Sequence, residues 1–290
     1  MRKPKPRQLR HKQRGMALFQ VLLMVAIISV LLIIMSKQTQ STVQQAQLLQ
    51  DRVERELALS SAAAYVDSLL LSNDWLISRN DPQSPLHQIN FYGEPHTIPL
   101  PQRAAYEALG PSLALQLQNE ASLLDVNFRT NDIEPLLLQL GKPPLQARQM
   151  VDELRNFLRA PEQIYFQNVA DLAHLESWTV EDVAMLRNLT SVSAPIFNPV
   201  WMPSELLSVL LTPEQAATIR SLRKSNESSA GLLQDFFGDI DAADTGIFPG
   251  IAQRMRLTDE SSGLELYREV DYRPRHPSPM RLYAKYFQQE

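Results

Sequence analysis

The longest uninterrupted run of apolar residues lies near the start of the chain, from Met16 to Met35. These twenty residues carry no charge, and Gln20 and Ser29 are the only polar side chains among them. Twenty helical residues span about 30 Å, the hydrocarbon thickness of a bilayer, and a helix satisfies its own backbone hydrogen bonds in lipid. The run therefore predicts a transmembrane helix.

After this run the apolar positions recur every three or four residues, which predicts that the helix continues, so that one N-terminal helix covers residues 16–72. An apolar stripe of this kind needs a surface to pack on, so we expect the second half of the helix to pack on a sheet in a globular head. Ser72-Asn73-Asp74 is a plausible stop. The stripe comprises Val43, Ala46, Leu49, Val53, Leu57, Ser61 and Ala64.

Residues 73–110 have a different character, because five prolines are spaced among short apolar pieces. Proline cannot donate a ladder hydrogen bond and is confined to edge strands and loops. Pieces such as HQINFYG and HTIPL therefore predict one or two short edge strands, which form the first part of the head.

Residues 111–225 are helical by pattern and contain a weak repeat, in which segments 137–154, 172–189 and 206–222 start 35 and 34 residues apart. Each segment predicts a short apolar helix, a turn and a second helix. Thr212 begins the best-formed second helix, with Pro at the first helical position and Gln215 at the capping-box position. Such hairpins are typical either of a DNA-binding module or of a structural all-α domain.

Residues 226–290 begin with an acidic linker rich in Ser, Gly and Asp. Asp239, Asp241 and Asp244 have a spacing that a calcium loop could use, although the twelve-residue loop with its terminal Glu is missing. Calcium is therefore a candidate cofactor here, and a solvated acidic turn is the alternative. No other cofactor is expected.

The last forty residues alternate apolar and polar side chains with a period of two. Segments 251–257, 264–271 and 280–287 predict an antiparallel meander with one wet face. This meander supplies the sheet that the first helix requires. The fold class is therefore α+β: a long helix on an antiparallel sheet, with an all-α domain over residues 111–225 inserted into the head.

Charge separates the start of the chain from the rest. The net charge is −4, but residues 1–15 hold seven Lys and Arg and no acid, so residues 16–290 carry 21 basic and 32 acidic residues, or −11. A basic flank stays on the cytoplasmic side of a membrane, which predicts a cytoplasmic N-terminus and a head outside. An acidic head argues against nucleic acid as a partner.

The sequence contains few of the residues and motifs that enzymes use for catalysis. The absence of cysteine excludes disulfides, thiolate metal sites and a cysteine nucleophile. GxSxG, HExxH and glycine-rich phosphate loops are also missing. We therefore predict that the protein is not an enzyme, and a membrane-anchored periplasmic hydrolase is the less supported alternative.

The junction Arg14-Gly15-Met16-Ala17-Leu18-Phe19-Gln20, in which a basic stretch ends in one Gly directly before the apolar run, resembles the leader of type IV pilins and type II secretion pseudopilins. The resemblance implies that prepilin peptidase removes residues 1–15 by cutting between Gly15 and Met16, with N-methylation of Met16. The family usually has Glu at the fifth mature position, where this chain has Gln20. The family location is the bacterial inner membrane, with a single span and a periplasmic head.

Because it lacks this Glu, the chain resembles the minor pseudopilin K family, general secretion pathway protein K. That family also carries helical hairpins of the sterile-alpha-motif type inserted into its pilin-like sheet, and Asp125-Val126-Asn127-Phe128 and residues 196–206 are similar to its linking segments. The resemblance implies placement at the tip of the periplasmic pseudopilus. Its partners would be the I-type and J-type minor pseudopilins, the major pseudopilin, prepilin peptidase and the inner-membrane assembly platform. A minor pilin of a type IV pilus or related adhesion system is the alternative.

Overall fold

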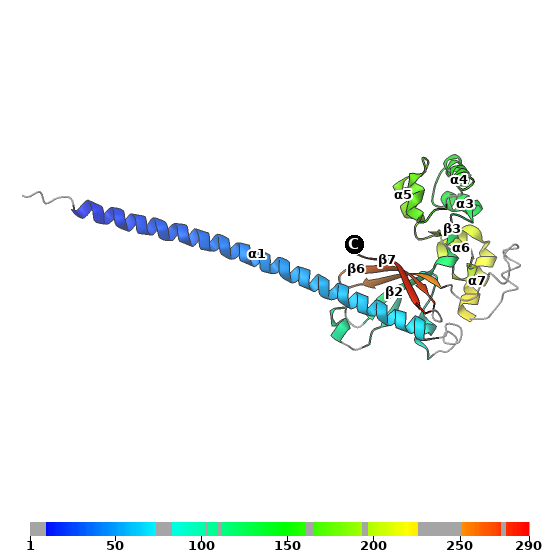
Figure 1. Ribbon diagram of the computed structural model, residues 1–290, viewed down its shortest axis with the longest axis horizontal. Coiled ribbons are helices and arrows are strands. Elements are labelled where there is room, and N and C mark those ends of the chain that lie inside the picture. Colours follow the sequence, from blue (N-terminus) through cyan, green and yellow to red (C-terminus); the bar gives the residue numbers. More distant parts are fainter. Residues whose placement is uncertain are drawn as a thin grey trace, which may run out of the picture. The chain divides into compact units, whose positions relative to one another are not determined.

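Helix α1 (Arg10–Ser72) is 63 residues long and continuous, which corresponds to about 95 Å (Figure 1). The computed structural model describes residues 10–73, 83–101, 104–109, 112–160, 165–192, 197–225, 251–273 and 277–289. Two compact units meet within α1, and the second, the head, begins at Glu56. The predicted long helix is confirmed. It starts before Met16, because the Arg, Lys and Gln residues there are strong helix formers.

The head contains a five-stranded sheet in which every neighbouring pair is antiparallel. The spatial order is β1-β2-β5-β6-β7. The three C-terminal strands confirm the predicted meander, and β1 is the predicted short edge strand. The bounds are β1 (His96–Pro99), β2 (Ser112–Asn119), β5 (Ala252–Asp259), β6 (Leu264–Tyr272) and β7 (Met280–Gln289), and the short 3-10 helices η1 (Pro85–Gln88) and η2 (Ala104–Leu109) precede and follow β1 in the sequence.

Strand β2 corrects the expectation that residues from 111 onward belong to the helical insert. Its sequence SLALQLQN alternates with period two, so that Leu113, Leu115 and Leu117 are buried, whereas Gln116 and Gln118 lie on the other face. A run of leucines and glutamines also suits a helix by propensity, but here pairing with β1 and β5 decides its structure. The insert therefore begins after Asn119.

The end of α1 packs on one face of the sheet through small and branched side chains. Ala58, Ala62 and Val66 are at most 3% exposed, and the alanines allow the helix backbone to approach the strands closely. The predicted stripe was wrong: Val43, Leu49, Val53 and Leu57 are 50–65% exposed. Most of that stripe precedes Glu56, where the head begins. Three- and four-residue spacing alone did not show which of two apolar faces packs on the sheet.

A buried polar cluster fixes α1 on the sheet. Asp67 accepts a hydrogen bond of 2.9 Å from Arg268 Nη1 and one of 2.6 Å from Tyr272 Oη, and both partners belong to β6. Burial, followed by the Asp67 charge, raises the pKa of Tyr272 well above its ordinary value. The hydroxyl therefore remains a donor at any ordinary pH.

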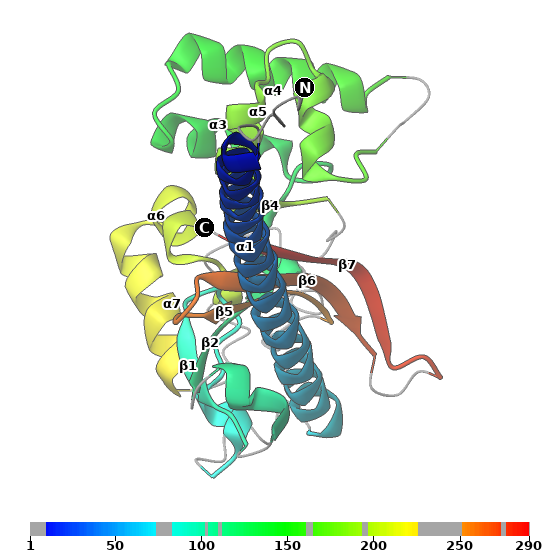
Figure 2. The ribbon, with the colours of Figure 1, turned by 90° about the vertical axis from the view of Figure 1, so that its left-hand side faces the viewer.

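The insert leaves the sheet at the end of β2 and returns at β5 (Figure 2). The three predicted hairpins are present as α3–α4, η4–α5 and α6–α7. A short parallel ladder, Leu124 with Thr190 and Asp125 with Ser191, ties the entry segment to the middle of the insert. The bounds are η3 (Glu120–Ser122), β3 (Leu124–Asp125), α3 (Thr130–Gln139), α4 (Pro144–Leu158), η4 (Val169–His174), α5 (Val180–Leu186), β4 (Thr190–Ser191), η5 (Pro199–Trp201), α6 (Ser204–Leu210) and α7 (Pro213–Ser225).

Side-chain caps hold the short helices of the insert. Gln215 N donates to Thr212 Oγ1 at 3.3 Å and Thr212 N donates to Gln215 Oε1 at 3.0 Å, which confirms the predicted capping box. Thr179 and Asp182 form the same motif at the start of α5. Such caps contribute about 1 kcal/mol each, a large share of what a two-turn helix needs.

Candidate functional site

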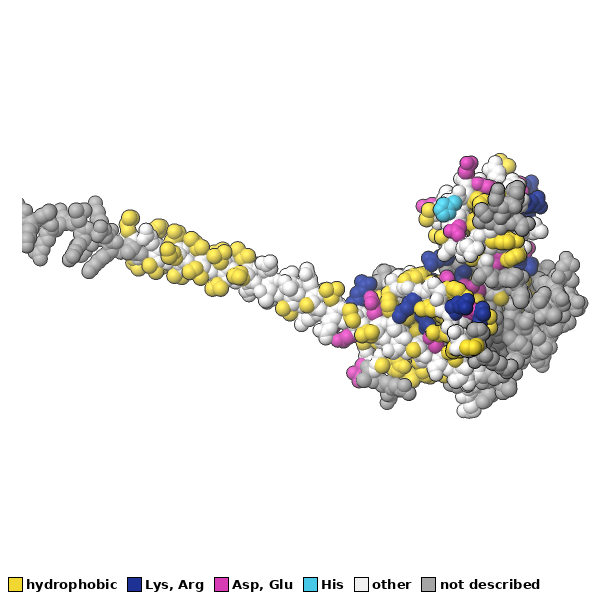
Figure 3. Space-filling model, in the orientation of Figure 1, with side chains coloured by type: hydrophobic (Ala, Val, Ile, Leu, Met, Phe, Trp, Pro, Cys, Tyr) yellow, Lys and Arg dark blue, Asp and Glu magenta, His cyan; other side chains and the backbone are white. Residues whose placement is uncertain are grey.

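The first candidate site is the exposed apolar part of α1, residues 16–35, and its junction with the basic residues before it. The Gly15–Met16 peptide bond lies inside α1, and Gln20 is exposed one helical turn after Met16. The large apolar side chains from Met16 to Met35 are 52–70% exposed (Figure 3). By length and composition this part of α1 can cross a membrane. Apolar surface of this extent requires lipid or other apolar helices around it.

The second candidate site is the joint between the sheet and the insert. The residues of β6 that face α1 alternate with residues that face the insert, so the insert covers the side of the sheet opposite α1. Tyr267 and Glu265, on this second face, are only 6% and 8% exposed. The expectation of one wet sheet face is therefore corrected, because the inserted domain folds back onto part of it.

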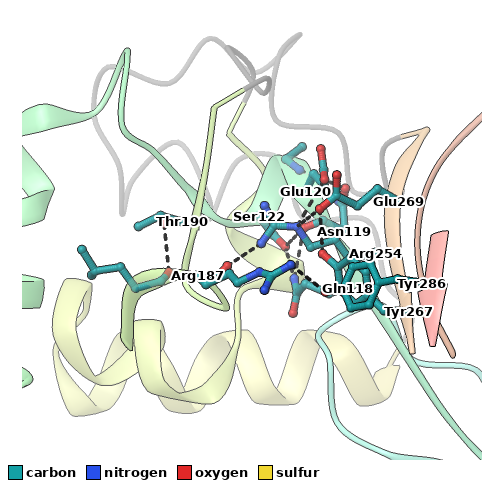
Figure 4. Close-up of polar contacts among 12 residues, drawn as sticks. Gln118, Asn119, Glu120, Ser122, Arg187, Thr190, Arg254, Tyr267, Glu269 and Tyr286 are labelled. Carbon is teal, nitrogen blue, oxygen red and sulfur yellow. Dashed lines mark hydrogen bonds and ion pairs between the residues drawn. The ribbon is translucent and has the colours of Figure 1, made fainter. Parts of the chain in front are cut away.

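Arg254 of β5 lies at the centre of the joint (Figure 4). Its Nε donates to Glu120 Oε1 at 3.2 Å, and its Nη1 donates to the carbonyl oxygen of Arg187 at 2.6 Å. The Arg254 side chain is 12% exposed and the Glu120 side chain 11%. Because this ion pair joins the sheet to the first residue of the insert, it resists displacement of the insert more than a solvated pair would.

Arg187, after α5, extends over two tyrosines of the sheet (Figure 4). Its guanidinium carbon lies 5.5 Å from the ring centroid of Tyr267 and 5.6 Å from that of Tyr286, and Nη2 donates to Tyr286 Oη at 2.6 Å. The two tyrosine rings stack at 4.8 Å. Burial raises the pKa of Tyr267 well above its ordinary value. Arg187 thus clamps the insert onto the sheet by hydrogen bonding and cation–π contact.

The two asparagine-bearing segments noted in the sequence hold the insert together. Asn127 accepts from Phe166 N at 3.0 Å and donates to the carbonyl oxygens of Phe166 and Val192 at 3.1 and 2.9 Å. Asn198 caps η5, and its backbone N–H donates to the carbonyl of Ala121 at 2.7 Å. Asn127 through its side chain and Asn198 through its backbone N–H therefore connect segments that lie far apart in the sequence.

An ion pair between Lys142 and Asp182 joins the turn before α4 to the first turn of α5. Burial alone would raise the pKa of the Asp182 carboxyl group, but hydrogen bonds from Lys142 and Thr179 lower it below its ordinary value. Asp182 thus links the first two hairpins, because the carboxylate that pairs with Lys142 also belongs to the capping box of α5.

Arg223 of α7 binds the backbone of η5. Its Nε donates to the carbonyl of Val200 at 2.6 Å, its Nη2 donates to the carbonyl of Met202, and its guanidinium carbon lies 4.3 Å from the ring centroid of Tyr92. Burial lowers the pKa of Arg223 to about 10, so the guanidinium remains charged at neutral pH. The third hairpin is thereby attached to the segment that precedes β1.

Two cavities lie on either side of Arg254. One of about 460 Å³ is bounded by β2, β5, β6 and the ends of α5 and α6, and the other, of about 430 Å³, lies toward Tyr283 and Asp271. The sequence contains only one signal for this region, the alternation that puts Arg254 and Arg256 on the same face of β5. Arg187 carries no such signal, because it belongs to a turn.

The predicted metal ligands Asp239, Asp241 and Asp244 lie outside the described residues. Within the described part of the chain, no three His, Asp or Glu side chains gather in a way that could hold a metal ion.

No protein-family model matches the chain, and no curated protein matches its sequence. A search of solved structures finds similarity to a chain of the GspK-GspI-GspJ complex from the type 2 secretion system of enterotoxigenic Escherichia coli. The two chains share 14% sequence identity with a TM-score of 0.49, over 83% of this chain and 99% of the other.

Proposed function

We propose that this protein is a minor pseudopilin of a type II secretion system, cut by prepilin peptidase between Gly15 and Met16 and N-methylated at Met16. The observation that carries the proposal is α1, a single rod with an exposed apolar first half and a last part that packs on an antiparallel sheet. An apolar rod on a folded head suits a subunit that is stored in a bilayer and then packed among similar rods. No enzymatic activity is proposed.

Cleavage makes physical sense for such a subunit. The leader holds seven basic side chains and no acid, and these charges would be costly between closely packed apolar helices. Their removal leaves a rod whose first charged side chain is Lys37. The proposed orientation has the leader in the cytoplasm and the head in the periplasm, across the bacterial inner membrane.

The tip position rests on Gln20 and on the insert. In the pilin family a carboxylate at this position pairs with the N-terminus of the next, more distal subunit. A subunit at the tip has no distal neighbour, so a neutral amide avoids an unpaired charge. The large insert also favours a position where no further subunit stacks. The proposed partners are I-type and J-type minor pseudopilins, the major pseudopilin and the assembly platform.

Intact-mass spectrometry of the protein from cells with and without prepilin peptidase tests the processing. We expect the loss of residues 1–15 and the gain of one methyl group in the presence of the peptidase alone. A protein that still starts at Met1 in peptidase-positive cells would overturn the proposal. Genes for secretion components beside this gene, rather than pilus genes, would then separate export from the alternative role in a type IV pilus.

A further inference from the structure

The larger of the two cavities beside Arg254 contains a guanidinium that the protein itself barely uses. Arg256 lies on the face of β5 that is turned toward the insert, and its side chain is 32% exposed. Its nearest carboxylate oxygen, on Glu265, is 3.8 Å from Nε, and Arg256 donates no hydrogen bond to any described residue. Glu265 instead accepts from Thr258 at 3.1 Å and from Gln288 at 2.6 Å. Among the described residues, the ion pair with Glu265 is thus the polar contact of Arg256, and its five N–H groups donate to none of them.

The side chains around Arg256 include others without internal partners. Gln116 lies opposite Arg256 on β2, Asn188 extends from the turn after α5, and neither amide makes a hydrogen bond with the described residues. Each amide offers both a donor and an acceptor, which match the C=O and N–H groups of a peptide backbone. Met185, 42% exposed, adds an adaptable apolar contact.

These features favour a peptide rather than a small anion. A phosphate or sulfate ion would use positive charges and donors, whereas this cleft also contains unused amide acceptors and the exposed carboxylate of Glu205. Glu205 would accept a hydrogen bond from a backbone N–H, a donor that an inorganic anion lacks. A volume of about 460 Å³ lies within the usual range for ligand pockets.

We propose that this cleft binds an extended segment of another protein, with a Glu or Asp side chain of that segment held by Arg256 and its backbone held by Gln116 and Asn188. A planar guanidinium binds a carboxylate through two parallel hydrogen bonds, which fixes the register of the bound segment. The proposal concerns the head alone, and does not depend on leader cleavage or on a position in a filament.

The test is a fluorescence anisotropy titration of the full chain in detergent micelles with a rhodamine-labelled, acetylated and amidated peptide, Ser-Thr-Glu-Val-Thr-Ser. We expect saturable binding that weakens at least about tenfold when Gln replaces the Glu of the peptide, and about tenfold in Arg256→Gln, because a charge-assisted bidentate contact is lost. Arg256→Lys should bind with intermediate affinity, since it keeps the charge without the fork.

Matched variants separate binding from folding. Arg148→Gln removes an exposed arginine of α4 and should leave the affinity unchanged, and Asn188→Ala, on the surface, should weaken binding without altering thermal unfolding. Equal affinity for the Glu and Gln peptides, equal affinity of wild type and Arg256→Gln, or no saturable binding would overturn the proposal. Displacement by inorganic phosphate at micromolar concentration would also overturn it, in favour of a small-anion site.

Discussion

Asp67 of α1 and Arg268 of β6 form an ion pair of 2.9 Å between side chains that are 10% and 5% exposed. The two residues are separated by 201 positions in the sequence, and together with Tyr272 they connect the end of the rod to strand β6 of the sheet. Any force along α1 therefore reaches the head partly through this pair. A buried charge left without its partner is far more costly than a solvated one.

Asp67→Ala should destabilise the head by about 3–5 kcal/mol, because Arg268 would keep a buried charge without its partner. Urea unfolding of the full chain in micelles, followed by fluorescence of the buried Trp178 and Trp201, measures this change. Asp152→Asn is the control, since Asp152 pairs with Arg155 on the surface and should change the free energy of unfolding by less than about 1 kcal/mol. Similar losses in both variants would contradict the prediction.

The contact between Arg187 and Tyr286 should contribute measurably to holding the insert on the sheet. A double-mutant cycle of Arg187→Gln and Tyr286→Phe should give a coupling energy of about 0.5–1 kcal/mol, below the usual range for a hydrogen bond to a charged group because Arg187 is exposed. Tyr283→Phe, at a 61% exposed neighbouring position, should show no coupling to Arg187. A coupling energy of zero at Tyr286 would show that the contact does not hold the insert.

The ion pair between Asp182 and Lys142 should make the link between the first two hairpins sensitive to acid. The folded-state pKa of Asp182 lies below its ordinary value of 3.8, so its stabilising contribution is complete above about pH 4 and is lost as the pH falls toward the folded-state pKa. Asp182→Asn should therefore cost at least about 2 kcal/mol at pH 7 and less near pH 3. Unfolding measured at both pH values, with exposed Glu181→Gln as control, tests this. A pH-independent difference would exclude the assigned ion pair.

Gly93 and Gly141 offer a matched pair for separating backbone strain from packing. Both have positive φ, 81° and 87°, but a Cβ at residue 93 would lie 2.6 Å from Gln118 Oε1, whereas nothing lies within 4 Å at residue 141. The Gln118 amide cannot move freely, because its nitrogen donates to Asn119, Ser122 and Trp201.

Gly141→Ala should therefore lower the free energy of unfolding by about 1 kcal/mol, because a side chain is strained at positive φ. Gly93→Ala should lower it by at least about 1 kcal/mol more, because the new Cβ also displaces Gln118. Thermal or urea unfolding of the two single variants gives the comparison. Equal costs at the two glycines would mean that Gln118 yields without loss of its hydrogen bonds.

Gln20→Glu tests the assembly role that we propose. The leader glycine is unchanged, so cleavage should proceed, but a carboxylate would enter the apolar rod at a cost of up to about 3 kcal/mol if it finds no partner. We expect normal processing by intact mass together with reduced cross-linking to the other minor pseudopilins. Ser29→Ala, in the same span, should leave cross-linking unchanged. Undiminished cross-linking of Gln20→Glu would argue against a position without a distal neighbour.

Local patterns along the chain sufficed to predict much of the fold. The period of two in residues 251–287, the hairpin repeats and the Thr212–Gln215 cap each depend on neighbours a few positions apart, and each is found in the structure. Strand β2 was assigned to the wrong domain because leucine and glutamine suit both helix and strand, and pairing with β5 decides between them.

The joint between sheet and insert was not predictable in the same way. Arg187 meets Tyr286 across 99 residues, and Arg254 meets Glu120 across 134. Neither pair has a local signature, because its geometry exists only once the insert has folded back onto the sheet. The apolar run and its flanking glycine, in contrast, are contiguous in the chain, so the amino-acid sequence alone is sufficient to propose the processing site.

The insert departs from the sheet and rejoins it at adjacent places, since Asn119 of β2 lies directly opposite Gln253 of β5. A tight hairpin turn joining these two positions would therefore close the same ladder without any helical domain. Loss or exchange of the domain during evolution would leave the strand register intact, and Tyr267, over which Arg187 of the insert now lies, would be uncovered. The sheet could therefore carry a different inserted domain at this one junction between β2 and β5.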